Sequence, residues 1–428
     1  PSDVLVARFD GFGAQYNQNL FAARSQQTGV TAAGIQTMTP KLAALGPQMA
    51  RLFFNPDAVD DPDLLNSFRK SVQLAQDTLA DGGTINITLQ ALGPNVIKKH
   101  PTAVKDFAAE LVRQVRDAHI DKLRWVTLRN EPNGSSPMDK NDYANAYREI
   151  DGQLRADGVR PPLQIMAGDL LLNNQLDWFQ FIGKNMANIV DAYSIHVYWD
   201  YRSPTKIDDR ILGVRDIVNG LGDAKKPLYV MEYGARGDKA PDGSEPGNTA
   251  AGDPVVDTNL NAFQRAWFAL QAVKKGFRGT VAWDAYFAKY DATPQDYSLI
   301  GPPDDWTRRP AFRALRLLIK AVRPGWKGVN VVGVSDTERI VGFTDGHDVT
   351  VAGLDIGGAQ QDSGSSASRS YTIGGLPGNT SFGLWFWNRD GDGMNSFDGR
   401  VQSDGGGNVS FEAPLRSVFV VTTLPPPA

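Results

Sequence analysis

The chain has 428 residues, of which 41% are hydrophobic and 10% aromatic, and it carries a formal net charge of −4. That charge offers no electrostatic attraction to nucleic acid or to an anionic membrane. The sequence contains no cysteine, which excludes disulfides, thiolate metal sites and cysteine nucleophiles. It also lacks the apolar run of about 18 residues that a membrane span requires. We therefore expect neither a nucleic-acid partner nor a membrane partner.

Through about residue 322, short β-type runs alternate with helical patterns, which is typical of βα units around a parallel sheet. The eight candidate strands cover residues 4–14, 49–53, 84–90, 124–129, 164–167, 192–197, 228–233 and 280–285. Helical patterns between them include residues 61–80, 101–118, 140–157 and 259–275. The alternation predicts an α/β fold, a (β/α)8 TIM barrel over residues 1–322. A doubly wound sheet is the alternative, but no Gly-rich phosphate loop follows the first strand.

From Gly325 onward the helical periodicity is lost, and turns rich in Gly, Asn and Asp separate short alternating runs. These runs cover residues 329–334, 339–343, 348–352, 370–373, 381–387, 408–411 and 417–423. They predict a C-terminal all-β sandwich domain over residues 325–424. Residues 425–428 form a Pro-rich tail like the linkers of extracellular multidomain proteins. We therefore expect a secreted or cell-envelope protein.

Two glutamates stand where predicted strands end. Glu131 follows one strand in the motif Asn130-Glu131-Pro132, and Glu232 ends another. Cleavage of a glycosidic bond needs two carboxyl groups, one to protonate the leaving oxygen and one to stabilise or trap the anomeric carbon. A separation of about 5–5.5 Å gives retention of configuration, and about 6.5–9.5 Å gives inversion. Because strand ends meet at one face of a barrel, we expect both side chains to reach one pocket.

Several polar residues are candidates for supporting this pair. The Asn130 amide is placed to donate to a sugar 2-hydroxyl. Arg51, with the phenols of Tyr229 and Tyr233, is expected to hold Glu232 ionised. Three more polar side chains near strand exits are candidates for binding sugar hydroxyls: Gln15, Asn17 and Asp169.

The motifs resemble glycoside hydrolase clan A, the retaining barrel enzymes whose catalytic glutamates follow the fourth and seventh strands. Asn130-Glu131-Pro132 matches the acid/base motif of that clan, and the surroundings of Glu232 match its nucleophile strand. Further matches are Met49-Ala50-Arg51-Leu52, the run from Ser194 to Trp199, Val281-Ala282-Trp283-Asp284, and the segments 10–15 and 305–312. The chain is most similar to families 39, 30 and 5, and to family 39 above all. The barrel match covers roughly three quarters of the chain, whereas the sandwich is matched in architecture alone.

The resemblance implies a retaining glycoside hydrolase that cleaves O-glycosidic bonds of a polysaccharide, oligosaccharide or glycoside. It implies that Glu131 is the acid/base and Glu232 the nucleophile, without a cofactor and with carbohydrate as the partner. The other roles it implies are support of the nucleophile by Arg51, a substrate contact by His196, donation to the nucleophile by Tyr198, and a sugar-stacking floor from Trp283. Purely structural roles remain open for Arg51, His196 and Trp283. A transglycosylase and a catalytically silent carbohydrate-binding barrel remain the alternative functions.

Two sets of residues are candidate metal sites, but the spacing of their residues does not fit a metal-binding motif. Residues 388–393 fit the first half of a calcium loop, but Gly399 stands where a bidentate glutamate is required, so a hairpin turn is the better interpretation. The four histidines lie far apart without a His-x-x-x-His spacing. We therefore expect no metal. The choice of sugar is expected to depend on the loops over residues 236–257 and 288–305.

Overall fold

The computed structural model describes residues 3–134, 137–171, 175–200, 206–209, 211–236, 255–289, 297–357, 368–390 and 395–425. Most of the loop over residues 236–257 and part of the loop over residues 288–305, both expected to determine the choice of sugar, lie outside these residues. So do part of the calcium-like segment and most of the Pro-rich tail. None of the helices in the described part of the chain has the length and apolar composition of a membrane span.

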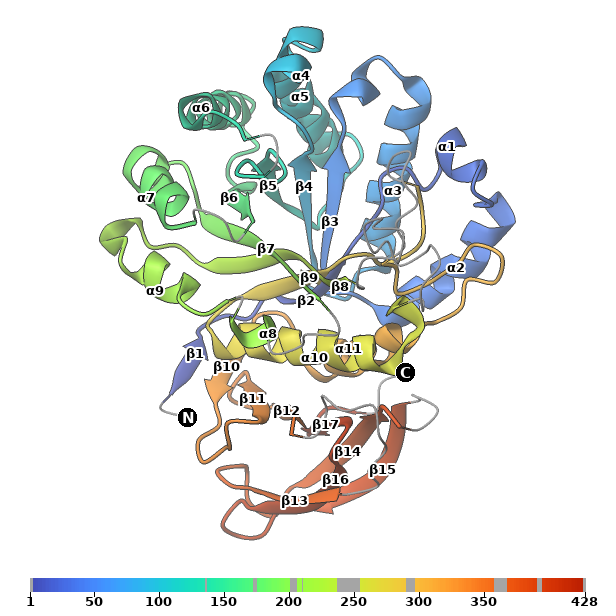
Figure 1. The fold of residues 1–428 in the computed structure, drawn as a ribbon, viewed down its shortest axis with the longest axis vertical. Helices are drawn as coiled ribbons and strands as arrows, with labels where there is room; N and C mark the ends of the chain where they lie inside the picture. The colour runs from blue at the N-terminus through green and yellow to red at the C-terminus, as the bar shows by residue number, and fades with distance from the viewer. Residues whose placement is uncertain are drawn as a thin grey trace.

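Parallel strands close into a barrel, as the alternating pattern predicted (Figure 1). They are β2 (Gly11–Gln15), β3 (Met49–Phe54), β4 (Thr84–Leu89), β5 (Leu123–Leu128), β6 (Gln164–Leu170), β7 (Ala192–Asp200), β8 (Leu228–Arg236) and β9 (Gly279–Ala282). The barrel closes where β9 pairs in parallel with β2, with Gly11 opposite Gly279. In this fold the loops at the carboxyl ends of the strands carry the functional groups.

Helices surround the barrel (Figure 1). The longer ones are α2 (Ala32–Leu45), α3 (Pro62–Thr78), α5 (Ala103–Arg116), α6 (Lys140–Ala156), α7 (Gln175–Met186), α10 (Asn259–Lys274) and α11 (Pro310–Ala321), and shorter ones are α1 (Ala23–Gln26), α4 (Pro94–Lys99), α8 (Lys206–Asp209) and α9 (Val214–Asn219). The sequence of α3 shows why such helices form. Asp61 accepts hydrogen bonds from the N–H groups of Asp63 and Leu64, and Pro62 occupies the first turn. Leu64, Phe68 and Val72 then recur every fourth residue on its buried side.

The C-terminal domain is a sandwich of unequal sheets. The larger has the strand order β1 (Val4–Val6), β10 (Lys327–Asn330), β11 (Glu338–Thr344), β12 (Val349–Asp355), β17 (Ser417–Thr422), β14 (Ser381–Asn388) and β15 (Asn395–Gln402). The smaller pairs β13 (Ser368–Ile373) with β16 (Val409–Pro414). The predicted fold class is therefore confirmed. None of the predicted runs covers β15, which pairs antiparallel with β14.

One expected strand was wrong. Residues 4–14 were predicted as a single barrel strand, but β1 belongs to the sandwich sheet, where Val4 pairs with Val329, and β2 alone enters the barrel. The N-terminal end of the chain therefore joins the C-terminal domain. An apolar run shows that a strand is buried, but it does not show which partner the strand pairs with.

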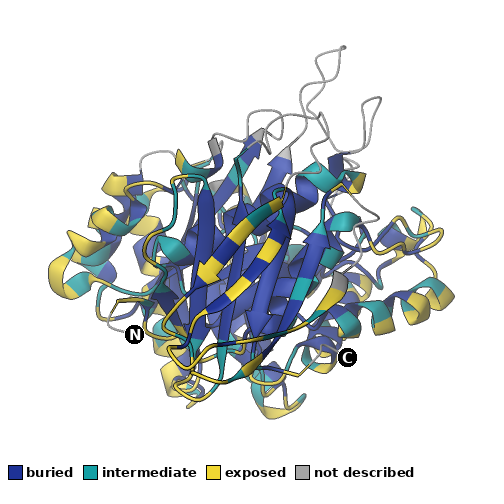
Figure 2. Ribbon diagram, turned by 90° about the horizontal axis from the view of Figure 1, so that it is seen from below, coloured by how far each residue is buried: buried dark blue, intermediate teal, exposed yellow. Residues whose placement is uncertain are grey.

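The central strands β11, β12 and β17 of the large sheet are buried on both faces: neighbouring residues of a strand point to opposite sides, and nearly all of them are buried. On β11, Val341 and Phe343 join the barrel's core, whereas Ile340 joins the core between the two sheets. Helices α10 and α11 lie between barrel and sandwich (Figure 1). Seen from the sandwich side, the central strands of the large sheet are buried almost throughout, and β13 and β16 in front of them alternate exposed and buried residues (Figure 2).

Candidate active site

Barrel strands deliver the candidate residues to one end of the barrel. Arg51 lies on β3, Asp169 on β6, His196 on β7 and Glu232 on β8, and Glu131 follows β5. The strand register shifts between Ala167 and Leu170, between Ile195 and His196, and between Val230 and Tyr233. Such bulges re-aim a side chain that regular alternation would point elsewhere. Each of Asp169, His196 and Glu232 lies within or directly after such a shift.

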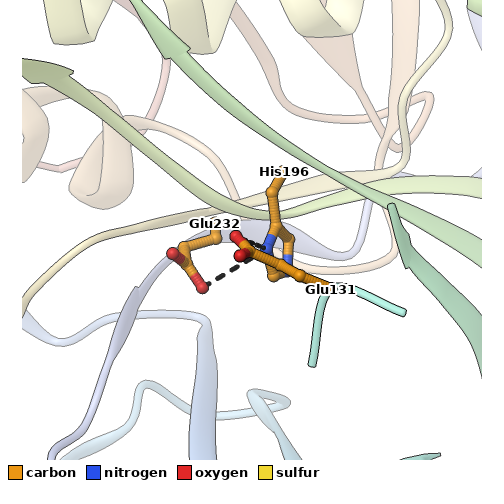
Figure 3. Close-up of side chains that lie close together, drawn as sticks. All are labelled: Glu131, His196 and Glu232. Atoms are coloured by element: carbon orange, nitrogen blue, oxygen red, sulfur yellow. Dashed lines mark hydrogen bonds and ion pairs between the residues drawn. The ribbon is translucent and has the colours of Figure 1, made fainter. Parts of the chain in front are cut away.

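The two glutamates converge. One carboxylate oxygen of Glu131, one of Glu232 and a ring nitrogen of His196 all lie within 4.8 Å of one another. Figure 3 shows the three side chains meeting from different elements. The Glu131 side chain is 29% exposed, whereas that of Glu232 is 7% exposed. The pair therefore combines a carboxyl group that solvent reaches with one that is nearly enclosed.

The turn that carries Glu131 is held from two sides. Asn133 donates to the Leu171 carbonyl and accepts from the Leu171 N–H, each at 2.9 Å, which joins the segments after β5 and β6. Glu131 itself has a φ of +48°, and Arg129 has a φ of +67°. Side chains other than glycine adopt this left-handed region at a cost of about 1 kcal/mol, so the surrounding contacts must maintain it.

Arg51 is the central cation of the site and is fully buried. Its guanidinium donates to Asp169 (2.6 Å), Asn130 (2.8 Å), Glu232 (2.9 Å), Thr88 (3.1 Å) and Gln15 (3.3 Å). Burial on its own lowers the pKa of Arg51, but Asp169 and Glu232 outweigh this effect and raise it. Burial likewise acts to raise the pKa of Asp169, but Arg51 and His196 hold it well below its usual range. The site therefore contains a permanently charged pair beneath the glutamates.

His196 lies between the three carboxylates. Its Nδ1 is 3.0 Å from Glu131 Oε1 and 3.4 Å from Glu232 Oε2, and its Nε2 is 3.5 Å from Asp169 Oδ1. Burial favours the neutral ring, but the charges of Glu232 and Asp169 outweigh burial and raise the pKa of His196 to about 9. At neutral pH the ring is therefore an imidazolium, a second cation beside Arg51.

Tyr198 supplies the phenol that contacts Glu232, donating its O–H to Oε1. Burial, followed by the charge of Glu232, raises the pKa of Tyr198 well above its usual value, which keeps the donor protonated. The phenols of Tyr229 and Tyr233, expected to serve Glu232, do not do so. Tyr229 donates to Asp10, and Tyr233 packs against Phe268. Pleating turns these neighbours away from the face that presents Glu232.

Three other predicted residues lie around this centre. Gln15 accepts from Arg51 and is buried. Trp283 follows β9 and is half-buried, with its ring 5.9 Å from that of Phe53. Asn17 is engaged elsewhere: its amide donates to the Ala288 carbonyl and accepts from the Asn19 N–H. Asn17 therefore ties the segment after β2 to the one after β9.

Sequence reasoning missed two hydroxyls beneath the site. Thr88 on β4 accepts from Arg51 Nε, and Ser194 on β7 donates to Asp169 Oδ1 at 2.7 Å. Both are fully buried. The signal for Thr88 was present: Asn86 and Thr88 alternate with Ile85, Ile87 and Leu89, which places polar groups on the barrel's interior side.

Glu131, His196 and Glu232 form a set that could hold a metal ion by geometry. The local charges argue against it. The carboxylates raise the pKa of His196, so a metal ion would have to displace a proton from the ring, and Arg51 already pairs with Glu232 at 2.9 Å. The donor set therefore fits a proton-transfer site better than a metal site.

Comparison with known proteins shows which solved structures share this fold. No protein-family model matches the chain, and a search of curated proteins finds no match. Among solved structures, the chain is similar to the catalytic domain of the GH30 xylanase C from Talaromyces cellulolyticus (TM-score 0.67, 14% identity, 99% of each chain covered). It is also similar to the GH39 enzyme from Xanthomonas axonopodis pv. citri (TM-score 0.63, 15% identity, 97% of this chain and 94% of that chain covered). A third similar structure is an α-L-arabinofuranosidase from Thermotoga maritima (TM-score 0.66, 10% identity, 99% of this chain and 98% of that chain covered). The fold expected from the resemblance to clan A, a barrel with an appended sandwich, is confirmed.

Proposed function

We propose that this chain is a retaining glycoside hydrolase in which Glu232 is the nucleophile and Glu131 the acid/base. The observation that carries the proposal is the approach of the two carboxylates, whose nearest oxygens lie within 4.8 Å. That distance suits the retaining geometry, because an inverting pair needs about 6.5–9.5 Å to hold a water molecule. The similar fold of the glycosidases named above supports the assignment.

In the first step, a carboxylate oxygen of Glu232 attacks the anomeric carbon while Glu131 gives its proton to the departing glycosidic oxygen. The bond to the leaving group breaks, and a covalent glycosyl-enzyme forms with the anomeric configuration inverted. In the second step, Glu131 takes a proton from water, which attacks the same carbon and releases Glu232. The second inversion restores the original configuration.

The surrounding charges suit the first step. Arg51 and His196 are cationic, and Asp169 and Glu232 are anionic, so the cluster is balanced when Glu131 carries the proton that it must donate. Arg51 and Tyr198 donate to different oxygens of Glu232, which orients the nucleophile. Asn130 accepts from Arg51 through Oδ1, which leaves its amide N–H groups to donate to the sugar 2-hydroxyl.

The test is azide rescue of Glu232→Gly with a panel of aryl glycosides that carry good leaving groups. Loss of the nucleophile is expected to lower turnover by several orders of magnitude, and azide is expected to restore it with a glycosyl azide of inverted configuration as product. The matched variant Glu131→Gly is expected to give a glycosyl azide of retained configuration. Failure of rescue in a folded Glu232→Gly protein, judged by circular dichroism, would overturn the assignment.

The same panel separates the alternatives. A transglycosylase would transfer the sugar to an added saccharide in preference to water, which product analysis detects. A catalytically silent barrel would hydrolyse none of the aryl glycosides. Action on a polymer also agrees with export from the cell, which fractionation of the native host would test.

A further inference from the structure

A cleft of about 560 Å³ opens beside the proposed catalytic pair. Its walls come from α1, from the segments after β3 and β4 together with α4, and from the segment after β5. We call it the cationic cleft, defined by Arg24, Gln90, Lys99, His100, Arg129 and Asn130. All its walls follow barrel strands at their carboxyl ends, the same end that carries Glu131 and Glu232.

We propose that the cationic cleft is a substrate subsite for a sugar unit that carries a negative charge, either a carboxylate or a sulfate group. The proposal rests on the proposed glycosidase function, since it names the chemical class of the substrate.

The cleft adjoins the catalytic centre, because two of its lining residues, Arg129 and Asn130, directly precede Glu131. Asn130 lines the cleft and also accepts from Arg51, the partner of Glu232. The left-handed backbone of Arg129 and Glu131 lets Arg129 line the cleft while Glu131 contacts His196. The backbone N–H groups of Arg129 and Asn130 donate to the carbonyls of Leu89 and Gln90, which fixes this turn against β4. A saccharide that binds at Glu131 and extends past Asn130 therefore enters the cleft.

The charge of the cleft is opposite in sign to that of the whole chain. Arg24, Lys99 and Arg129 line it, against one lining carboxylate, Asp57, which contacts Lys99 (2.6 Å) and His100 (2.8 Å). A second carboxylate, Asp60, lies outside the lining, 3.4 Å from His100. The chain as a whole has a formal net charge of −4, so this local excess of cations is not a general property of its surface. Guanidinium groups suit carboxylate and sulfate because they can donate two parallel hydrogen bonds.

Side-chain amides supply hydrogen-bonding groups of the kind that a sugar-binding site needs. Asn55, Gln90, Asn95 and Asn130 line the cleft. Side-chain amides both donate and accept hydrogen bonds, which suits sugar hydroxyls. The cleft thus offers amide groups that can bind sugar hydroxyls, next to cations that can bind an anion.

The test measures binding to the full-length Glu232→Gln protein, which prevents turnover of the probe. The probes are polygalacturonate, alginate, glucuronoxylan and chondroitin sulfate, each compared with its carboxyl-reduced or desulfated form by affinity electrophoresis and calorimetry. At least one acidic polymer is expected to bind about tenfold tighter than its neutralised form, with the preference weakening as salt is added. The carboxyl-reduced and desulfated arms show which anion is recognised.

Matched variants locate the effect. Arg24→Gln and Arg129→Gln, each made in the Glu232→Gln protein, are expected to reduce the preference about tenfold, the usual effect of losing one charge-assisted hydrogen bond. Arg215→Gln removes the same charge from a separate cleft at the opposite, N-terminal end of the barrel and is expected to leave the preference unchanged. Equal binding of acidic and neutralised polymers, or an equal loss in all three variants, overturns the subsite.

The two proposals fail separately. Small aryl glycosides test hydrolysis by the wild-type chain without requiring the cleft. Hydrolysis without any anion preference would overturn the subsite alone, and anion preference without hydrolysis of any probe would overturn the glycosidase.

Discussion

Arg51 determines whether the carboxylates of this site can coexist. It is fully buried and contacts Asp169 and Glu232 directly, with Thr88 fixing its Nε. Two carboxylates brought together in a barrel interior repel each other, and each loses the solvation that water would give it. A planar guanidinium can serve several acceptors in fixed directions, which an ammonium group cannot. The geometry of Glu232 therefore depends on this side chain.

We expect Arg51→Lys to lower kcat/KM by about 100-fold, similar to the loss of one preorganised donor in other enzymes. The lysine retains the charge but cannot reach Asp169, Asn130 and Glu232 together. Steady-state kinetics on an aryl glycoside measures the change. Arg160→Lys is the control, because Arg160 is also a buried arginine with carboxylate partners, Asp151 and Asp191, but lies outside the site. Equal losses in the two variants would show a general effect of altering a buried arginine.

His196 makes stability depend on pH. Its pKa is about 9 in the folded protein, compared with an ordinary value of 6.5. A raised pKa gives stability that is fully present below pH 6.5 and is lost as pH rises through 9. We expect the free energy of unfolding to fall by up to roughly 3 kcal/mol over this range, the free energy that separates the two pKa values. Urea denaturation from pH 6 to pH 9.5 measures it.

The corresponding variants assign this pH dependence to one side chain. His196→Asn is expected to be less stable than the wild type at pH 6 and to approach it in stability near pH 9.5. His347→Asn, at a site where the side chain is 93% exposed, should follow the wild type throughout. Parallel curves for wild type and His196→Asn would contradict the assignment.

At the scale of secondary structure, the sequence predicted the repeating units well and their irregularities poorly. The alternation of short β-type runs with helical patterns marked the barrel strands, although the first run was drawn too long. It did so because each strand packs against the helix that follows it, a local relation. The transfer of β1 to the sandwich and the presence of β15 depend on pairing with distant residues. The same limit applies to the site. Strand ends identified Glu131 and Glu232, but the register shifts that aim Asp169, His196 and Glu232 are set by neighbouring strands.

Gly168 shows how a strand irregularity supports the site. It has a φ of +130°, and a Cβ placed on it would lie 2.2 Å from the Ser194 carbonyl oxygen, a backbone atom that cannot move aside. The next residue, Asp169, pairs with Arg51. Close approach of β6 to β7 at this glycine therefore positions the buried carboxylate.

We expect Gly168→Ala to destabilise the protein by more than about 3 kcal/mol, since it combines backbone strain with a backbone clash. Chemical denaturation measures the change. Gly152→Ala in α6 is the matched control: a Cβ there meets no atom within 4 Å, so the same substitution in a helix is expected to stabilise by about 0.5–1 kcal/mol. A small effect at Gly168 would show that the strand can separate from β7 without cost.

At the scale of the whole molecule, one face of the sandwich's large sheet joins the hydrophobic core around the barrel. Phe343 of β11 lies 5.2 Å from the ring of Phe9 and 6.2 Å from that of Phe12, at the start of the barrel. Thr350 of β12 donates to the Ala321 carbonyl at the end of α11. The N-terminal strand β1 also completes the sandwich sheet. Neither part can bury its apolar surface without the other, so we infer that the sandwich stabilises the barrel.

This shared core predicts a single cooperative unfolding transition for the full chain in calorimetry. Phe343→Ala is expected to lower the midpoint of that single transition by roughly 5 °C, because removing a buried phenylalanine costs about 3–5 kcal/mol and both parts lose the contact. Val332→Ala, at a residue that is 78% exposed, is expected to leave the midpoint unchanged. If the domains were independent, the scan would show two transitions, and Phe343→Ala would shift the sandwich transition alone. Aryl-glycosidase activity, measured after heating to successive temperatures, should then outlast the unfolding of the sandwich, whereas a shared core requires both to be lost together.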